Sequence, residues 1–180
     1  MIDLSPAAFV HPCALLYGDI AIGNGVSFWP YAVARAEVYS ISIGDYTNIQ
    51  DHVMLHVGYA TGLKIGAYCS ITHRAVLHGC TIGDNCLIGI GATVMDGAVI
   101  GENSIVGEQA LVRSGFIAPP NSIVAGIPAR IIRTQDNRKA NRINAIMYHE
   151  NALAYARGHH RTWSESDFAS RVSAQLDTEA

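Results

Sequence analysis

The chain has 180 residues, of which 49% are hydrophobic, and its formal net charge at pH 7 is -3. This size and composition suffice for one compact domain with a continuous core. The small negative charge excludes the basic surface of a nucleic-acid-binding protein, and no apolar stretch is long enough to make a membrane the partner. Because the N-terminus lacks the basic and long apolar regions of a signal peptide, we expect a cytoplasmic protein.

A repeated Ile-Gly pair marks the first two thirds of the chain. The pairs that recur at about one coil's spacing start at Ile22, Ile43, Ile65, Ile82 and Ile100, at intervals of 21, 22, 17 and 18 residues. Apolar residues recur within each interval about every six positions, a period of neither an amphipathic helix nor an alternating strand. The repeat predicts a solenoid of triangular coils, in which each hexapeptide crosses one face and points an aliphatic side chain inward. The glycines suit corners, where the backbone bends and can take positive φ.

The two longest intervals exceed one coil by 3 and 4 residues. We therefore expect small outward loops near residues 36–40 and 58–62, and both are candidate walls of a site. Asn48 is expected at a coil corner, because asparagine tolerates turn geometry.

The four cysteines are expected to serve packing. Cys69 and Cys86 are 17 residues apart, about one coil, so they should stack in the interior as small apolar side chains. The sequence has no CxxC pair. We expect no disulfide in a reducing cytoplasm.

The repeat ends near residue 133. The sequence therefore predicts a β-helix domain at 1–133 and a helical segment at 134–180 that packs on it. Residues 138–155 are rich in helix-compatible side chains, and Ile143, Ile146, Met147 and Leu153 fall near one face that can cover the prism wall. A second short helix is expected to begin at Ser164, whose hydroxyl can cap it.

Three histidines lie within the repeat. His56 and His78 are 22 residues apart, and subtracting the 4-residue loop leaves one coil, so the two should stack on one face about 4.8 Å apart. His73 precedes His78 by five residues, which places it about 16 Å away around a corner. A zinc ion holds imidazole nitrogens at about 2.0–2.1 Å. If all three are ligands, His73 must come from a neighbouring chain, and packing around a threefold axis would create three such sites.

The histidines and their surroundings resemble the gamma-class carbonic anhydrase family. The matching stretch lies within residues 10–133 and contains Arg35-Ala-Glu37, Asn48-Ile-Gln-Asp51, Leu55-His56-Val57, His73-Arg-Ala-Val-Leu-His-Gly-Cys80 and Met95-Asp-Gly-Ala-Val-Ile-Gly101. The resemblance implies a left-handed parallel β-helix that forms a homotrimer. It also implies that His56 and His78 of one subunit bind Zn²⁺ together with His73 of the next, with Fe²⁺ or Co²⁺ in some members.

The same resemblance implies an activity and supporting residues. The reaction is the reversible hydration of CO2 to bicarbonate, for which zinc lowers the pKa of a bound water to about 7, as it does in carbonic anhydrase. Arg35 and Asp51 resemble the ion pair between adjacent subunits, a geometry that suits the planar fork of arginine. Gln50 resembles the residue that hydrogen-bonds the metal-bound water or bicarbonate.

The sequence departs from the best-studied family pattern at the proton-transfer residues. Glu37 replaces an aspartate, and Val38 stands where a glutamate follows it. The long acidic loop after the first ligand is reduced to residues 58–62, with Tyr59 in place of a shuttling carboxylate. We therefore expect an intact metal site with low turnover, in which Glu37 either moves protons or holds Arg35.

Two other functions stay open at this point. A hexapeptide acyltransferase would use an acyl-CoA, with Gly126-Ile-Pro-Ala-Arg130 placing Arg130 near a CoA phosphate and with His56 or His78 as general base. The same motif also ends the coil of metal-binding relatives. The third alternative is a non-catalytic trimeric scaffold that binds metal. Hydration activity separates the first function from the third, and CoA binding identifies the second.

Overall fold

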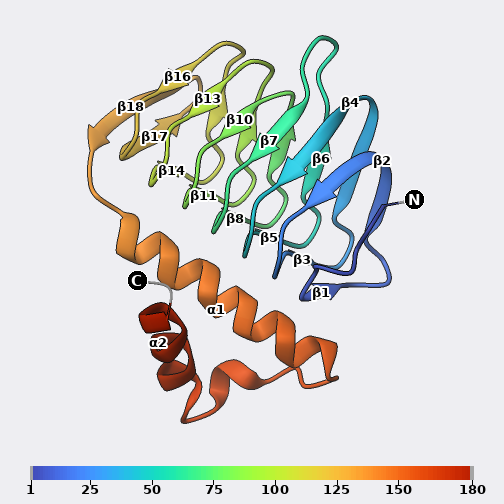
Figure 1. Cartoon of the computed structure of the whole chain (residues 1–180). Helices are drawn as coiled ribbons and strands as arrows, with labels where there is room; N and C mark the ends of the chain where they lie inside the picture. Colours follow the sequence, from blue (N-terminus) through green and yellow to red (C-terminus); the bar gives the residue numbers. More distant parts are fainter. Residues whose placement is uncertain (1, 179–180) are drawn as a thin grey trace.

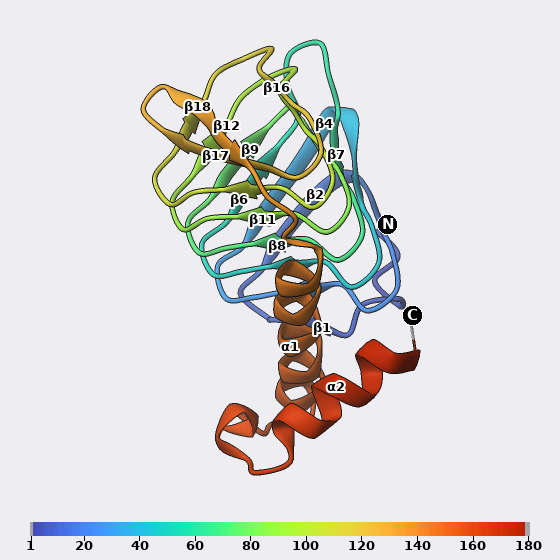
Figure 2. The ribbon, with the colours of Figure 1, turned by 90° about the vertical axis from the view of Figure 1, so that its left-hand side faces the viewer.

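The computed structural model describes residues 2–178 and confirms the predicted architecture, a left-handed parallel β-helix followed by C-terminal helices (Figure 1). Figure 2 views the solenoid from the end that carries β17 and β18, and its coils lie one behind another as a prism. Each coil pairs in parallel with the coils before and after it, so the strands form flat walls around an enclosed core.

The walls are built from two hydrogen-bonded sheets. The first wall is the eight-stranded sheet of β1 (Phe9–Val10), β3 (Ser27–Phe28), β5 (Asn48–Ile49), β8 (Ser70–Ile71), β11 (Leu87–Ile88), β14 (Ile105–Val106), β17 (Ser122–Gly126) and β18 (Ala129–Thr134). The second wall contains β6 (Met54–His56), β9 (Val76–His78), β12 (Thr93–Val94) and β15 (Leu111–Val112). The third wall contains β7 (Leu63–Ile65), β10 (Thr81–Ile82), β13 (Val99–Ile100) and β16 (Ile117–Ala118).

Two long strands join the second and third walls. β4 (Val33–Ile43) pairs with β6 through residues 33–35 and with β7 through residues 41–43. β2 (Leu15–Ile22) follows the same path, with a register shift between Gly18 and Ile20. The loop expected at 36–40 is wrong as to its type, because these residues continue β4, but residues 37–40 form an exposed bulge opposite β2. The loop at 58–62 is confirmed, and it projects between β6 and β7 in Figure 1.

The core is a set of aliphatic columns, one for each wall. On the first wall the column of register partners is Ile49, Ile71, Ile88, Val106 and Val124, all fully buried. Each such side chain contributes about 1.5–3 kcal/mol when it leaves water. Burial at every sixth position is therefore enough to select the coil over a helix.

The corner glycines have a different role from the one expected. Gly83 does not adopt positive φ; a Cβ there would lie 2.7 Å from the Glu102 amide nitrogen of the next coil. Positive φ falls two residues later, at Asn85 and Asn103, with φ of 56° and 59°. The Ile-Gly pair therefore reflects close approach of successive coils. Asn48 is likewise not at a corner but buried in β5.

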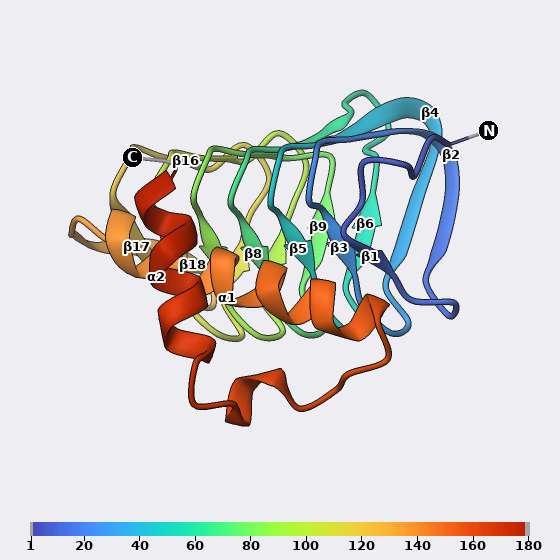
Figure 3. The same ribbon diagram turned by 60° about the horizontal axis from the view of Figure 1, so that its bottom comes forward.

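The C-terminal segment covers the first wall. α1 (Arg138–Ala156) lies along it and contacts β1, β5 and β8, as Figure 3 shows. α2 (Phe168–Thr178) packs on α1 through Phe168, Val172 and Ile146. The second helix is therefore confirmed, but its expected start and cap at Ser164 are wrong. Ser164 ends a short 3-10 turn, η1 (Thr162–Ser164), and its hydroxyl donates to the Arg161 carbonyl. Among residues 2–178 no helix has the length and apolar character to cross a bilayer.

The packing prediction is confirmed for Cys69, Cys80 and Cys86, which are buried, and it is wrong for Cys13, which is exposed. Cys69 and Cys86 are buried on successive coils, and the Cys86 amide donates to Cys69 Sγ at 3.5 Å. All four cysteines are free. Burial raises the pKa of Cys80 to about 12 and that of Cys69 well above its usual value, so both stay protonated at neutral pH.

Candidate metal centre

Arg35, His56 and His78 form a ladder on the second wall. They are register partners on β4, β6 and β9, which confirms the expectation that the two histidines stack on one face. Their ring centroids are 5.0 Å apart. Both side chains are partly exposed, at 23% for His56 and 30% for His78, so they border the solvent rather than the core.

The two rings turn one nitrogen toward each other. His56 Nδ1 lies 3.0 Å from His78 Nε2. Two neutral imidazoles can place at most one proton between these nitrogens, so at least one lone pair points into the space they share. A cation could use both lone pairs.

His73 lies apart from this pair. It follows β8 of the first wall, in the turn where Arg74 has a φ of 60°. The Arg74 amide donates to the Asp51 carbonyl at 3.0 Å, which ties this turn to the coil before it. Within residues 2–178, no group of three or more His, Cys, Asp or Glu side chains is arranged to hold a metal ion.

Each of the three imidazoles has one ring nitrogen next to a carboxylate. For His56 and His78 this is the outer nitrogen, the one that does not face the other ring, and the facing nitrogens are called the inner nitrogens. His56 Nε2 is 3.1 Å from Glu37 Oε2, and His78 Nδ1 is 2.9 Å from Asp96 Oδ1. His73 Nδ1 is 3.0 Å from Asp51 Oδ2. Metal-binding histidines usually donate their second N–H to such a carboxylate, which fixes the tautomer and the ring orientation. The donor set of this chain therefore fits a zinc-type ion, with inner nitrogens as ligands and carboxylates behind them.

Glu37 joins Arg35 to the histidine ladder. Its Oε1 forms an ion pair with Arg35, while Oε2 faces His56. Desolvation raises the pKa of the Glu37 carboxyl, but a backbone hydrogen bond and the nearby Arg35 and His56 outweigh this and lower it below its usual value. Of the two expected roles for Glu37, holding Arg35 is observed. Within one chain Asp51 pairs with His73, so the Arg35–Asp51 pair between subunits stays a prediction.

Gln50 belongs to a buried polar chain. Its Nε2 donates to Asn48 Oδ1 at 2.9 Å, and Asn48 Nδ2 donates to Ser70 Oγ at 3.0 Å. The Ser70 hydroxyl in turn donates to Asn144 Oδ1 of α1 at 2.7 Å. Gln50 and Asn48 are each only 1% exposed. The C-terminal helix therefore helps to orient the amide of Gln50.

The remaining expected site residues lie at the edges of the fold. Tyr59, in the 58–62 loop, is 99% exposed. Arg130 is exposed in the hairpin of β17 and β18, which turns between Gly126 and Ala129. The 126–130 motif thus ends the coil.

Asp96 is the site residue that sequence reasoning missed. It lies 18 residues after His78, one coil further along. This 18-residue interval could have indicated that Asp96 lies beside His78, because the same one-coil spacing predicted the pairing of His56 with His78. An acidic residue at such a spacing is also common at corners, however, and only its contact with His78 separates the two cases.

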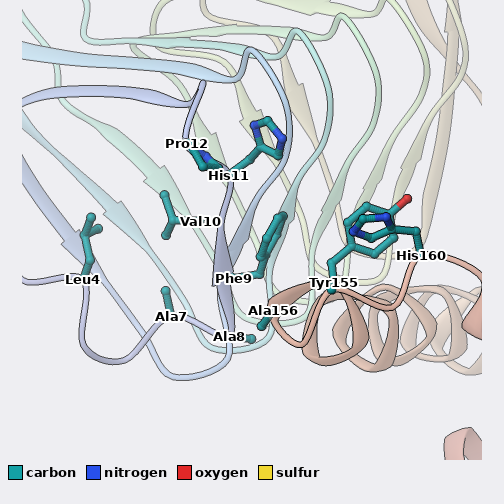
Figure 4. A pocket seen from close by; sticks show the side chains of 11 residues that line it. Leu4, Ala7, Ala8, Phe9, Val10, His11, Pro12, Tyr155, Ala156 and His160 are labelled. Carbon is teal, nitrogen blue, oxygen red and sulfur yellow. The ribbon is translucent and has the colours of Figure 1, made fainter.

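A cavity of about 770 Å³ opens between β1 and the end of α1, and none of the expected site residues lines it. Figure 4 shows Phe9, Tyr155 and His160 on one side and Leu4 and Val10 on the other. Its rings extend the contact between Trp29 and Tyr155, whose centroids are 4.9 Å apart. This cavity belongs to the junction between the coil and the helix.

Comparison with known proteins bears on the repeat and the site. Residues 79–114 match the family model described as bacterial transferase hexapeptide (six repeats). A probable carbonic anhydrase of Methanocaldococcus jannaschii is 50% identical over 137 residues, 75% of this chain and 86% of that protein. Gamma carbonic anhydrase 3, mitochondrial, of Arabidopsis thaliana is 46% identical over 174 residues, 92% of this chain and 67% of that protein. The crystal structure of a hexapeptide transferase family protein from Anaplasma phagocytophilum has a TM-score of 0.77 and 34% identity, over 87% of this chain and 90% of that one.

Proposed function

The chain belongs to the gamma-class carbonic anhydrase family, and from this membership we propose that it hydrates CO2 reversibly to bicarbonate with a bound Zn²⁺, Fe²⁺ or Co²⁺. The observation that carries the proposal is the pair of inner nitrogens, His56 Nδ1 and His78 Nε2, which face each other at 3.0 Å. Carboxylates behind both rings support their use as metal ligands.

The third ligand in this proposal is His73 of a neighbouring subunit in a homotrimer. Asp51 holds His73 Nδ1 at 3.0 Å, which leaves Nε2 of His73 for a metal on the adjoining subunit. Arg35 and Asp51 would form an ion pair across the same interface and set its register. Threefold symmetry then gives three equivalent sites.

The chemistry that the cation supplies when bound is a water ligand acidic enough to serve as the nucleophile near neutral pH. Gln50 would hydrogen-bond the metal-bound water or bicarbonate, since its Nε2 is committed to Asn48 and its carbonyl oxygen can accept a hydrogen bond from an O–H group. Glu37 keeps the ring of His56 in place and accepts a proton from the site. Tyr59, exposed on the loop, passes protons to the solvent.

The experiment that tests this function is stopped-flow CO2 hydration, performed on protein purified without oxygen and reconstituted with zinc, cobalt or iron. Metal is counted per chain in the same samples. We expect about one metal per chain, and activity that His78→Ala abolishes. His160→Ala, at an exposed ring on the helical segment, is the matched histidine control and should keep full activity.

The shared site has its own test. His73→Ala and His78→Ala homotrimers should both lack metal, whereas mixed trimers of the two variants regain an intact site at some interfaces. If verified mixed trimers recover no metal, the ligands do not come from two subunits.

An acyltransferase is the second candidate, and the similarity to a hexapeptide transferase family protein supports it. In that function His56 or His78 is the general base and Arg130 binds a CoA phosphate. Calorimetric titration with CoA tests it, with Arg130→Ala as the variant that should lose binding. A chain that holds metal fully, hydrates no CO2 and ignores CoA is the metal-binding scaffold.

A further inference from the structure

Asp96 contacts the ring nitrogen of His78 that does not face His56. It follows β12 on the next coil, and its Oδ1 lies 2.9 Å from His78 Nδ1. A neutral imidazole carries a proton on only one nitrogen, and a carboxylate can only accept. Asp96 therefore selects the tautomer with Nδ1–H, and the lone pair of His78 Nε2 stays directed at His56 Nδ1.

The chain leaves room for this carboxylate with two glycines. A Cβ on either Gly58 or Gly79 would collide with Asp96 Oδ1. The two glycines are also close to each other, since a Cβ on Gly79 would lie 2.8 Å from Gly58 Cα. Asp96 thus occupies a narrow cradle that any larger side chain at these two positions would fill.

The 58–62 loop closes this cradle. The Gly58 amide donates to the Thr61 carbonyl at 2.8 Å, which turns the loop back on itself. The Thr61 hydroxyl donates to the Gly79 carbonyl at 2.9 Å, which ties the loop to the coil of His78. The insertion that breaks the repeat after His56 therefore lies over Asp96.

We propose that Asp96, clamped by the 58–62 loop between Gly58 and Gly79, is the positioning residue that sets His78 Nε2 as a metal ligand. For its consequence on metal binding the inference rests on the proposed function. The contact between Asp96 and His78 is a property of the metal-free chain. The two parts can therefore be tested separately.

The first test compares Asp96→Ala and Asp96→Asn with Asp84→Asn. Asp84 is the matched control: its Oδ1 accepts the Ala67 amide at 2.9 Å beside another close-packed glycine, Gly66, away from the histidines. Zinc affinity is measured by competition with a chelator. Because loss of such a partner costs about 10–100-fold in metal affinity, we expect Asp96→Ala to weaken binding by that factor, Asp96→Asn by less, and Asp84→Asn by under twofold. Equal affinities in Asp96→Ala and Asp84→Asn would overturn the proposal.

The second test reads the tautomer without metal. Long-range ¹H–¹⁵N NMR at mildly alkaline pH should find the proton of His78 on Nδ1, and Asp96→Ala should remove this preference. A proton on Nε2 in the unsubstituted chain would overturn the proposal. If the unsubstituted chain binds no zinc, the proposed function fails, while the tautomer still decides the role of Asp96.

The third test uses the cradle itself. Gly79→Ala would push a methyl group into Asp96, whereas Gly97→Ala, also at positive φ, has its nearest neighbour 3.8 Å away. Both variants place alanine at positive φ, so their difference reflects the contacts of the methyl group at position 79, which meets Thr61 Oγ1 and Gly58 Cα as well as Asp96 Oδ1. We expect Gly79→Ala alone to lower zinc affinity about tenfold, and equal affinities would show that the clamp does not matter.

Discussion

The coils from Thr81 to Ala118 differ from those that carry the histidines. The later coils contain only two-residue strands with no loop between them, and each strand places one fully or nearly fully buried side chain inside. The earlier coils contain the long strands β2 and β4, the 58–62 loop and His56, His73 and His78, while Asp96 contacts His78 from the first of the later coils. Where the repeat is regular it stabilises the prism, and where it is interrupted it positions polar side chains.

This division has a physical cause. An uninterrupted coil closes around its aliphatic column and adds no backbone outside its wall. A few extra residues at a corner add backbone outside the wall at little entropic cost, and that backbone can cover a carboxylate such as Asp96. The interruptions in the repeat therefore mark the functional side of the molecule.

The largest effect expected on stability comes from the regular coils. Ile88→Ala removes a fully buried side chain from the column of the first wall, and we expect a loss of about 2–5 kcal/mol in the free energy of unfolding. His56→Ala, in the interrupted coils, should cost about 1 kcal/mol or less because the ring is partly exposed. Urea denaturation of the metal-free variants measures both losses. If Ile88→Ala and His56→Ala lose similar free energies of unfolding, the two regions do not differ in their contribution to stability.

The junction between the regular coils and α1 should be the next most sensitive place. Asn85 has a φ of 56°, and its Nδ2 donates to Asn103 Oδ1 at 2.8 Å and to the Arg138 carbonyl at 2.9 Å. Asn85→Ala loses both bonds and strains the backbone, so we expect about 1–3 kcal/mol. Asn85→Gly keeps the backbone relaxed, and in the same urea titration it should be the milder variant. If Asn85→Ala lowers the free energy of unfolding less than Asn85→Gly does, backbone strain does not contribute at this corner.

These two regions were not equally predictable from the sequence. The columns follow from hexapeptide spacing alone, and so does the pairing of His56 with His78. Residues 36–40 were expected as a loop because they exceed one coil, but β4 takes up the extra length as an exposed bulge of residues 37–40 opposite β2. Asp96 and the chain from Gln50 to Asn144 depend on contacts across coils and with a helix far along the sequence. Spacing gives their distance along the prism and not the direction of their side chains.

The 58–62 loop offers a finer probe of the interrupted coils. Thr61→Val keeps the shape of the side chain and removes the hydroxyl that donates to the Gly79 carbonyl. We expect a loss of about 0.5–1.5 kcal/mol in the free energy of unfolding. Thr93→Val in strand β12 is the control and should change little, because valine suits a strand. Faster amide hydrogen exchange at Gly58 in Thr61→Val alone would place the loss in the loop, and an unchanged exchange rate would count against that placement.

The smallest stability effect belongs to Tyr59, on the same loop. Its side chain is 99% exposed, so Tyr59→Phe should change the free energy of unfolding by no more than about 0.5 kcal/mol. Its effect is expected on proton transfer: the CO2 hydration rate should fall at low buffer concentration and recover when imidazole is added, because a small buffer can replace a missing shuttle. Tyr39→Phe, on the exposed stretch of β4, controls for loss of a surface hydroxyl. If the hydration rate does not depend on Tyr59 at any buffer concentration, the loop has no role in proton transfer and serves only to cover Asp96. That role requires the loop backbone and Thr61 but no side chain at position 59.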